Sequence, residues 1–193
     1  ARGMGSHVMV TEINPVRALE AVMDGFTVMS LNDAARLGDI FVTVTGCSGV
    51  ISARHFTRMK DGAILANSGH FDVEIDLKAL KRLSRSHRLM RQGIDQYVLR
   101  NGRRINVLGE GRLVNLACAE GHPASVMDMS FATQALMTEW CVKNRSALKI
   151  DVMDVPKEME QVIAGVKLAT MDVRMDVLTE AQKKYLAGWE EGT

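Results

Sequence analysis

Short β-rich runs alternate with amphipathic helical runs over the first 83 residues, and this alternation constrains the fold more than any other feature. Between the β-rich runs, apolar residues recur at intervals of three and four, which is the period of a helix. Such alternation is typical of an α/β protein with a parallel sheet that carries helices on both faces. The predicted strands are residues 7–11, 26–29, 40–45 and 63–66, and the predicted helices cover residues 16–23, 50–59 and 73–83.

The pattern changes after Leu83. Asn101-Gly102 separates two further β-rich runs, 97–99 and 104–108, and this dipeptide is typical of a two-residue hairpin turn. We therefore expect an antiparallel addition at one edge of the sheet. A run of arginines at every third position precedes the hairpin, and we interpret it as a solvated helix end and turn: Arg82, Arg85, Arg88 and Arg91.

The last third of the chain is predicted to be helical and does not extend the alternation. Residues 125–143 predict a long helix with apolar residues on much of its surface, as in a helix buried between two bodies. Two more helices are predicted, over residues 156–168 with Asp154 as the cap, and after Thr179, which forms a capping box with Gln182. The predicted division is one domain over 1–122 and a connecting helix with a helical tail over 123–193.

Composition excludes several classes of function. Lys and Arg total 24 against 23 for Asp and Glu, so no net field favours nucleic acid or an anionic membrane as a partner. No apolar run has the roughly 20 residues of a membrane span, and no histidine pair has the spacing of a metal site. The three cysteines are widely spaced, which favours a reducing compartment and predicts a cytoplasmic protein.

An acidic residue follows the first predicted strand. In dinucleotide-binding folds of the Rossmann type, the second strand ends in an acid that binds the adenosine ribose, and a glycine-rich phosphate loop lies about 20 residues before it. Only 11 residues precede Glu12. We therefore expect a Rossmann-like sheet that is incomplete at its N-terminal end, lacking the first strand and the glycine-rich loop. A surface carboxylate with no ligand is the alternative.

Three stretches place small residues, an amide or a histidine where strands should end: Thr45–Cys47, Asn67–Asp76 and Gly109–Pro123. The carboxyl ends of parallel strands meet at one edge of the sheet, where α/β proteins bind ligands. We therefore expect these stretches to face one crevice. The alternatives are a solvent-facing loop histidine at His70 and a small buried packing residue at Cys47.

The chain resembles the S-adenosylhomocysteine hydrolase family. The resemblance covers nearly all of residues 1–140 and returns at Leu178–Leu186. It departs at Ser68, where the family usually has isoleucine. The family's N-terminal substrate domain and its basic, tyrosine-bearing C-terminal extension are not found in this sequence. The matching segments are Val10–Pro15, Ala18–Gly25, Thr45–Cys47, Arg54–Phe56, Asn67–Asp76 and Glu110–Pro123.

The resemblance implies NAD as the cofactor and assigns candidate site residues. Glu12 would bind the adenosine ribose, and Asn115 the carboxamide. The implied cofactor-binding set is Glu12, Arg17, Thr45, Gly46, Cys47, Ser68, Gly69, His70, Asn115 and His122, and the implied substrate-binding set is His70, Leu113, Leu116, His122, Met127 and Phe131.

The family's reaction, as the resemblance implies it, oxidises the 3′-hydroxyl of the substrate to a ketone, which acidifies the neighbouring carbon. The homocysteine thiolate then leaves, water adds, and the hydride returns. His70 would act catalytically by polarisation or proton transfer. The implied partners are S-adenosylhomocysteine or adenosine, a substrate domain on the same or a companion chain, and further copies in a homo-oligomer, a tetramer by resemblance. The alternatives are an S-inosylhomocysteine hydrolase, a non-catalytic cofactor-binding or oligomerising fragment, and a hydroxyacid dehydrogenase, which leaves residues 109–123 unexplained.

Overall fold

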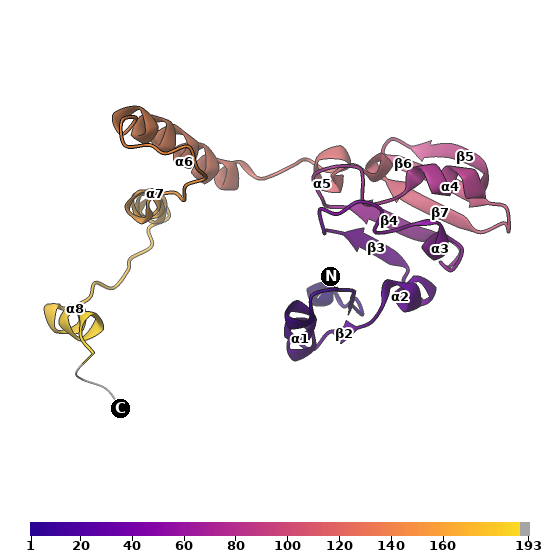
Figure 1. Cartoon of the computed structure of the whole chain (residues 1–193), viewed down its shortest axis with the longest axis horizontal. Coiled ribbons are helices and arrows are strands. Elements are labelled where there is room, and N and C mark those ends of the chain that lie inside the picture. The colour runs from indigo at the N-terminus through magenta and orange to yellow at the C-terminus, as the bar shows by residue number, and fades with distance from the viewer. Residues whose placement is uncertain (190–193) are drawn as a thin grey trace. The chain divides into compact units, whose positions relative to one another are not determined.

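The computed structural model describes residues 1–189 and divides the chain into two compact units, Ala1–Gly121 and His122–Thr193. The first unit is built on a five-stranded sheet in the order β3-β4-β7-β6-β5 (Figure 1). A short parallel pair, β1 with β2, forms a separate sheet. The strands are β1 (Met9–Val10), β2 (Thr27–Val28), β3 (Ile40–Thr43), β4 (Ala63–Asn67), β5 (Ser84–Arg91), β6 (Ile94–Leu99) and β7 (Arg104–Leu108).

The larger sheet is mixed. β3, β4 and β7 run parallel, whereas β6 and β5 are added antiparallel beyond β7. The α/β class with a Rossmann-like sheet of parallel strands, flanked by helices, is therefore confirmed, and so is the antiparallel addition at its edge. The helices and 3-10 turns of this unit are η1 (Arg2–Met4), α1 (Pro15–Met23), α2 (Leu31–Leu37), α3 (Ala53–Phe56), α4 (Leu77–Leu83), η2 (Gly109–Gly111) and α5 (Val114–Ala117).

The core lies between the sheet and helices α2, α3 and α4. Alternate residues of the parallel strands, such as Leu65 and Ile105, point into it, because successive side chains of a strand face opposite sides. Phe56 and Leu80 meet them from the helices and are fully buried. Burial of each large side chain contributes roughly 1.5–3 kcal/mol, so this cluster supplies the rigid base for the loops at the strand ends.

Two predicted helices are shorter than expected. Asp76 caps α4 by accepting a hydrogen bond from the backbone N–H of Ala79 (2.9 Å), so the helix begins at Leu77 and not at Val73. The run predicted as helix over 50–59 forms only the single turn α3. α2 and α5 were not predicted from the sequence.

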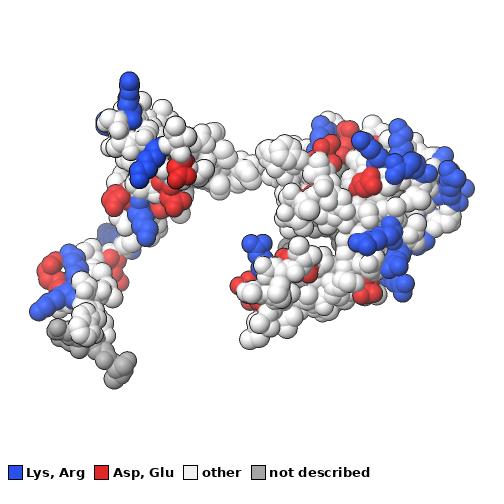
Figure 2. Space-filling model, viewed as in Figure 1, with Lys and Arg blue, Asp and Glu red and all other residues white. Residues whose placement is uncertain are grey.

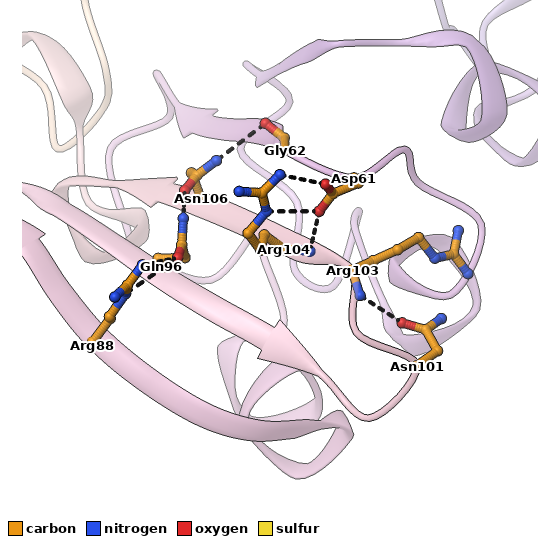
Figure 3. Close-up of polar contacts among 8 residues, drawn as sticks. All are labelled: Asp61, Gly62, Arg88, Gln96, Asn101, Arg103, Arg104 and Asn106. Carbon is orange, nitrogen blue, oxygen red and sulfur yellow. Dashed lines mark hydrogen bonds and ion pairs between the residues drawn. The ribbon is translucent and has the colours of Figure 1, made fainter.

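The prediction that the arginine run forms a helix end and turn holds only for Arg82, in the last turn of α4, because Arg85, Arg88 and Arg91 lie on the edge strand β5. From this strand, a row of polar side chains crosses the antiparallel part of the sheet (Figure 3). Arg88 donates to Gln96 Oε1 (Nη2, 2.9 Å), Gln96 donates to Asn106 Oδ1 (3.0 Å), and Asn106 donates to the carbonyl of Gly62 (3.1 Å). Lys and Arg side chains gather over this end of the unit (Figure 2). Charge on an exposed edge strand opposes pairing with another sheet.

The turn between β6 and β7 has three residues, Arg100–Gly102, and not the two that were predicted. Leu99 pairs with Arg103 across the turn (N–H to carbonyl, 2.8 Å), and the N–H of Gly102 donates to the carbonyl of Leu99 (2.9 Å). Gly102 has a φ of 89°, which glycine adopts at the least cost.

The second unit contains three helices within its described residues: α6 (Ala124–Lys143), α7 (Lys157–Thr170) and α8 (Glu180–Ala187). α6 and α7 pack together around Ile163, and Lys167 Nζ lies 3.0 Å from the Asp128 carboxylate. The Thr179 capping box is confirmed, whereas the cap predicted at Asp154 is wrong because α7 starts after Pro156 with no side-chain cap. Over residues 1–189, no helix combines the length and apolarity needed to cross a membrane.

Candidate functional site

Three loops meet at the carboxyl ends of the parallel strands β3, β4 and β7. The N–H of Ser68, just beyond β4, donates to the carbonyl of Thr43 at the end of β3 (2.8 Å). On the other side, Asn67 forms a parallel bridge with Leu113, which follows β7. The structure therefore brings the ends of the three strands together as predicted.

The side chain of Asn67 joins these loops and is fully buried. Its Oδ1 accepts hydrogen bonds from the N–H of Gly69 (2.7 Å) and the hydroxyl of Thr43 (3.1 Å). Its Nδ2 donates to the carbonyls of Phe71 (2.8 Å) and Gly111 (2.9 Å). Because a buried amide is costly unless its hydrogen bonds are made, this pattern holds one arrangement of the three loops.

A second buried polar group, the carboxylate of Glu74, lies beside Asn67. Glu74 is 1% exposed and accepts from the N–H of Thr45 (3.0 Å), the hydroxyl of Thr45 (2.6 Å) and the N–H of Gly46 (2.8 Å). Burial acts to raise the pKa of Glu74, but the hydrogen bonds from Thr45 and Gly46 outweigh it and hold the pKa below its ordinary value. The loop after β3 is thus tied to an ionised carboxylate.

Lack of space requires glycine at the end of β4, and backbone conformation favours glycine after β7. A Cβ on Gly69 would lie 1.9 Å from Glu74 Oε1, so no larger residue fits there without moving the carboxylate. After β7, Gly109, Glu110 and Gly111 all have positive φ (58°, 55° and 74°). The left-handed region costs an L-residue such as Glu110 about 1–2 kcal/mol, and strain of this kind is concentrated at functional sites.

Thr45, Gly46 and Cys47 lie in an exposed loop. β3 ends at Thr43, two residues before the predicted end of the strand, and the next helix begins at Ala53, three residues after its predicted start. Cys47 is exposed, which contradicts the interpretation as a buried packing residue. Its N–H donates to the hydroxyl of Thr45 (3.1 Å), and no atom lies within 4 Å of a Cβ built on Gly46. The loop therefore presents small groups to a ligand.

His70 and Asn115 follow β4 and β7. His70 is exposed and its ring packs edge-to-face on Phe71, with ring centroids 4.7 Å apart. Asn115 lies on α5 and is half-buried, and its Oδ1 is buried with no hydrogen-bond partner. Nearby in sequence, Leu113 is half-buried and Leu116 is 60% exposed. These residues offer an unused acceptor beside apolar side chains.

Glu12 and Arg17 lie apart from these loops, at the carboxyl end of β1. Glu12 is exposed and its Oε1 accepts from the N–H groups of Asn14 (2.9 Å) and Ile13 (2.6 Å), which lowers the pKa of this carboxyl. Arg17 is exposed on the first turn of α1, which Asn14 caps. An ionised acid at this strand end can accept the hydroxyl hydrogen bonds of a ribose.

Three predicted residues belong to the second unit. His122 is exposed and directly precedes Pro123, the cap of α6. On α6, Met127 is half-buried and Phe131 is 58% exposed.

The positioning roles of Asn67, Thr43 and Glu74 were not predicted from the sequence. Glu74 lay within a run that was predicted as a helix, and an acidic residue between apolar residues of a helix is expected on the solvent-exposed face. The signal that could have found it is the sequence Val73-Glu74-Ile75, which leads from a glycine-containing turn into the core.

Comparison with known proteins decides the family. Residues 1–121 match the family model for the NAD binding domain of S-adenosyl-L-homocysteine hydrolase. The chain belongs to this family. NAD is accordingly the cofactor of the domain.

Similar proteins match over the full length of the chain. Adenosylhomocysteinases from Gloeobacter violaceus and Thermosynechococcus vestitus are 56% and 58% identical to it over 193 residues, which are 100% of this chain and 45% of each relative. The S-inosyl-L-homocysteine hydrolase of Methanocaldococcus jannaschii is 54% identical over 193 residues, 100% of this chain and 46% of that protein. The chain thus spans about half the length of the curated relatives that it matches.

The residues at the strand ends fit NAD. The unpaired Oδ1 of Asn115 is an acceptor for an amide N–H, such as that of a carboxamide. The open space beside Gly46 allows a flat ring to approach the main chain there. The site's polar groups are therefore matched to this ligand.

Proposed function

We propose that this chain supplies the NAD-binding part of an enzyme that reversibly hydrolyses S-adenosyl-L-homocysteine to adenosine and homocysteine. The observation that carries the proposal is the meeting of the β3, β4 and β7 loops at one sheet edge, with the unpaired acceptor of Asn115 among them. The names of the relatives support the same reaction.

In this proposal the loops divide the binding of NAD. Glu12 binds the adenosine ribose with Arg17 beside it, and Thr45, Gly46 and Cys47 line the path of the cofactor. Ser68, Gly69 and His70 lie at the nicotinamide end. Asn115 binds the carboxamide, and His122 also contacts the cofactor. Leu113, Leu116, Met127 and Phe131 pack around the nucleoside, which His70 and His122 also contact.

When bound, NAD would accept a hydride from the ribose carbon of the substrate and return it at the end of the reaction. The chain's own contribution is to orient the substrate and to exclude water from the 3′-keto intermediate. We propose that His70 polarises the substrate oxygen or transfers a proton at it. Replacing His70 with Ala in the complete enzyme is expected to lower turnover by roughly 10²–10⁴-fold, and near-normal turnover would remove this role.

The activity test uses the full-length protein with S-adenosylhomocysteine and S-inosylhomocysteine as competing substrates. Release of homocysteine, detected with a thiol reagent, and of the nucleoside, detected by chromatography, is expected with the adenosyl substrate. Preference for the inosyl substrate would support the alternative that the M. jannaschii relative suggests. Hydrolysis of neither would contradict the proposal.

The remaining proposals concern organisation. We propose residues 1–122 as the NAD-binding domain and residues 123–193 as a connecting helix and tail that dock on a substrate domain or a neighbouring subunit. We further propose a homo-oligomer, a tetramer by resemblance, acting in one-carbon metabolism in the cytoplasm, where the free cysteines of the described residues would stay reduced. The isolated 193-residue chain is expected to show no hydrolysis, and turnover by it alone would contradict this division.

A further inference from the structure

Glu74 contacts both loops that form the nicotinamide end of the proposed site, although it is not among the residues assigned to the cofactor. All three of its hydrogen-bond donors belong to Thr45 and Gly46, in the loop after β3. Its Oε1 also lies directly against Gly69, in the loop after β4, as the 1.9 Å approach of a built Cβ demonstrates. A single carboxylate therefore sets the separation of the two loops.

The charge of Glu74 is not neutralised by a cation. Among the described residues no Lys, Arg or His forms an ion pair with it, and the donors that surround it are two backbone N–H groups and one hydroxyl. Packing alone does not require a carboxylate here, because a buried charge is costly and an apolar side chain could fill the volume. Its negative potential extends to the loop at Gly69, which lies directly against Oε1.

We propose that Glu74 is a positioning residue with an electrostatic role, in that it holds Thr45 and Gly46 against Gly69 and its negative charge makes the site prefer the positively charged NAD⁺ over NADH. This inference rests on the proposed function, since it requires the nicotinamide to bind between these loops. The oxidised and reduced rings differ by one positive charge, so a nearby fixed carboxylate stabilises the first and not the second. Such a preference keeps the cofactor ready to accept the hydride of a new substrate.

The test compares the binding of NAD⁺ and NADH to full-length protein, wild type and variants, after removal of bound cofactor. Glu74→Gln removes the charge, and Glu74→Asp keeps it on a shorter side chain. Asp61→Asn is the matched control, because Asp61 is an exposed carboxylate paired with Arg104 before the start of β4. Calorimetry gives the Kd of NAD⁺, and the fluorescence of the reduced ring gives the Kd of NADH.

In Glu74→Gln we expect the ratio of the NADH Kd to the NAD⁺ Kd to fall about tenfold, the effect of a 1.4 kcal/mol difference between the two ring charges. Glu74→Asp is expected to keep most of the wild-type ratio while weakening both forms, and Asp61→Asn to change neither. An unchanged ratio in Glu74→Gln, or the same fall in Glu74→Asp as in Glu74→Gln, would overturn the electrostatic role.

Variant folding and the proposed function are controlled separately. Circular dichroism checks the fold of each variant. If Glu74→Gln fails to fold, the Glu74→Asp variant decides: a fall in its ratio of NADH Kd to NAD⁺ Kd overturns the inference, and a ratio close to that of the wild type supports it. Wild-type protein that binds neither NAD⁺ nor NADH would overturn the proposed function itself. That result differs from wild-type binding with an unchanged ratio, which would overturn only the role of Glu74.

Discussion

Replacing Gly69 with Ala tests whether Glu74 sets the geometry of the loops. The added Cβ would lie 1.9 Å from Glu74 Oε1 and 3.0 Å from Asn67 Oδ1, so the carboxylate must move. Gly69 does not have a positive φ, so the cost arises from this clash and not from backbone strain. Overpacking costs roughly 1–3 kcal/mol, and each lost hydrogen bond to a charged group costs about 1.5–3 kcal/mol. We expect about 3 kcal/mol from displacing the carboxylate.

Hydrogen exchange of the full-length protein measures this cost locally. The amides of Thr45 and Gly46 donate to Glu74, so a loss of about 3 kcal/mol would raise their exchange rate by roughly a hundredfold. Gly3→Ala is the matched control, because Gly3 lacks a positive φ and no atom lies within 4 Å of its built Cβ. Unchanged exchange at both amides in Gly69→Ala would contradict the geometry described above.

A double-mutant cycle separates the clash from any general effect of alanine. Once Glu74 is truncated to Ala, the added methyl group at Gly69 has space, so the loss of melting temperature caused by Gly69→Ala should shrink to that of the Gly3→Ala control. An equal loss in both backgrounds would refute the reasoning, since it would place the cost somewhere other than at the carboxylate.

Three further predictions concern single contacts. Asn115→Ala should weaken NAD binding about tenfold in calorimetry with no fall in melting temperature, because its Oδ1 has no partner in the protein; a fall in melting temperature without a change in Kd would contradict this. The hydrogen bonds and charge of Arg104 lower the pKa of Asp61 to about 2. The contribution of this pair to folding stability is therefore present above pH 4 and is lost as the pH falls through 2. In an NMR titration of Arg104→Gln the Asp61 carboxyl should titrate at a higher pH, and an unchanged titration midpoint would exclude Arg104 as the cause. Gly102→Ala places a Cβ at a φ of 89° and should cost about 1 kcal/mol in a thermal unfolding series, whereas a neutral effect would argue against the three-residue turn.

The parallel core could be predicted from sequence because it follows a simple physical period. Strands that are buried on both faces, such as β4, read as continuous apolar runs, and the helix around α1 has Pro15 at its start. The edge strand β5 could not be predicted in this way. It is exposed along nearly its whole length, so no apolar alternation marks it, and two register shifts against β6 disturb the period further.

The residues of the candidate site likewise fall into a group that could be predicted from the sequence and a group that could not. The residues proposed to contact a ligand, such as His70, were identified because glycines, amides and histidines at strand ends have few structural uses. The residues that hold the loops were missed because they bond to backbone groups distant in sequence. Asn67 donates to the carbonyl of Gly111, 44 positions later, and Glu74 accepts from the N–H of Thr45, 29 positions earlier. A hydrogen bond of this kind leaves no periodic trace in the sequence.

Asn67 and Glu74 also explain why this sheet edge can be rigid without apolar packing. Both side chains are buried, and together they accept from or donate to all three loops beyond β3, β4 and β7. Satisfied buried polar networks specify one geometry, because any shift leaves an unpaired group in a low-dielectric interior. The exposed Gly46 and the half-buried Gly69 then need no side chains of their own to stay in place. A cofactor can therefore contact the main chain directly, at a site whose shape is determined by the buried amide of Asn67 and the buried carboxylate of Glu74.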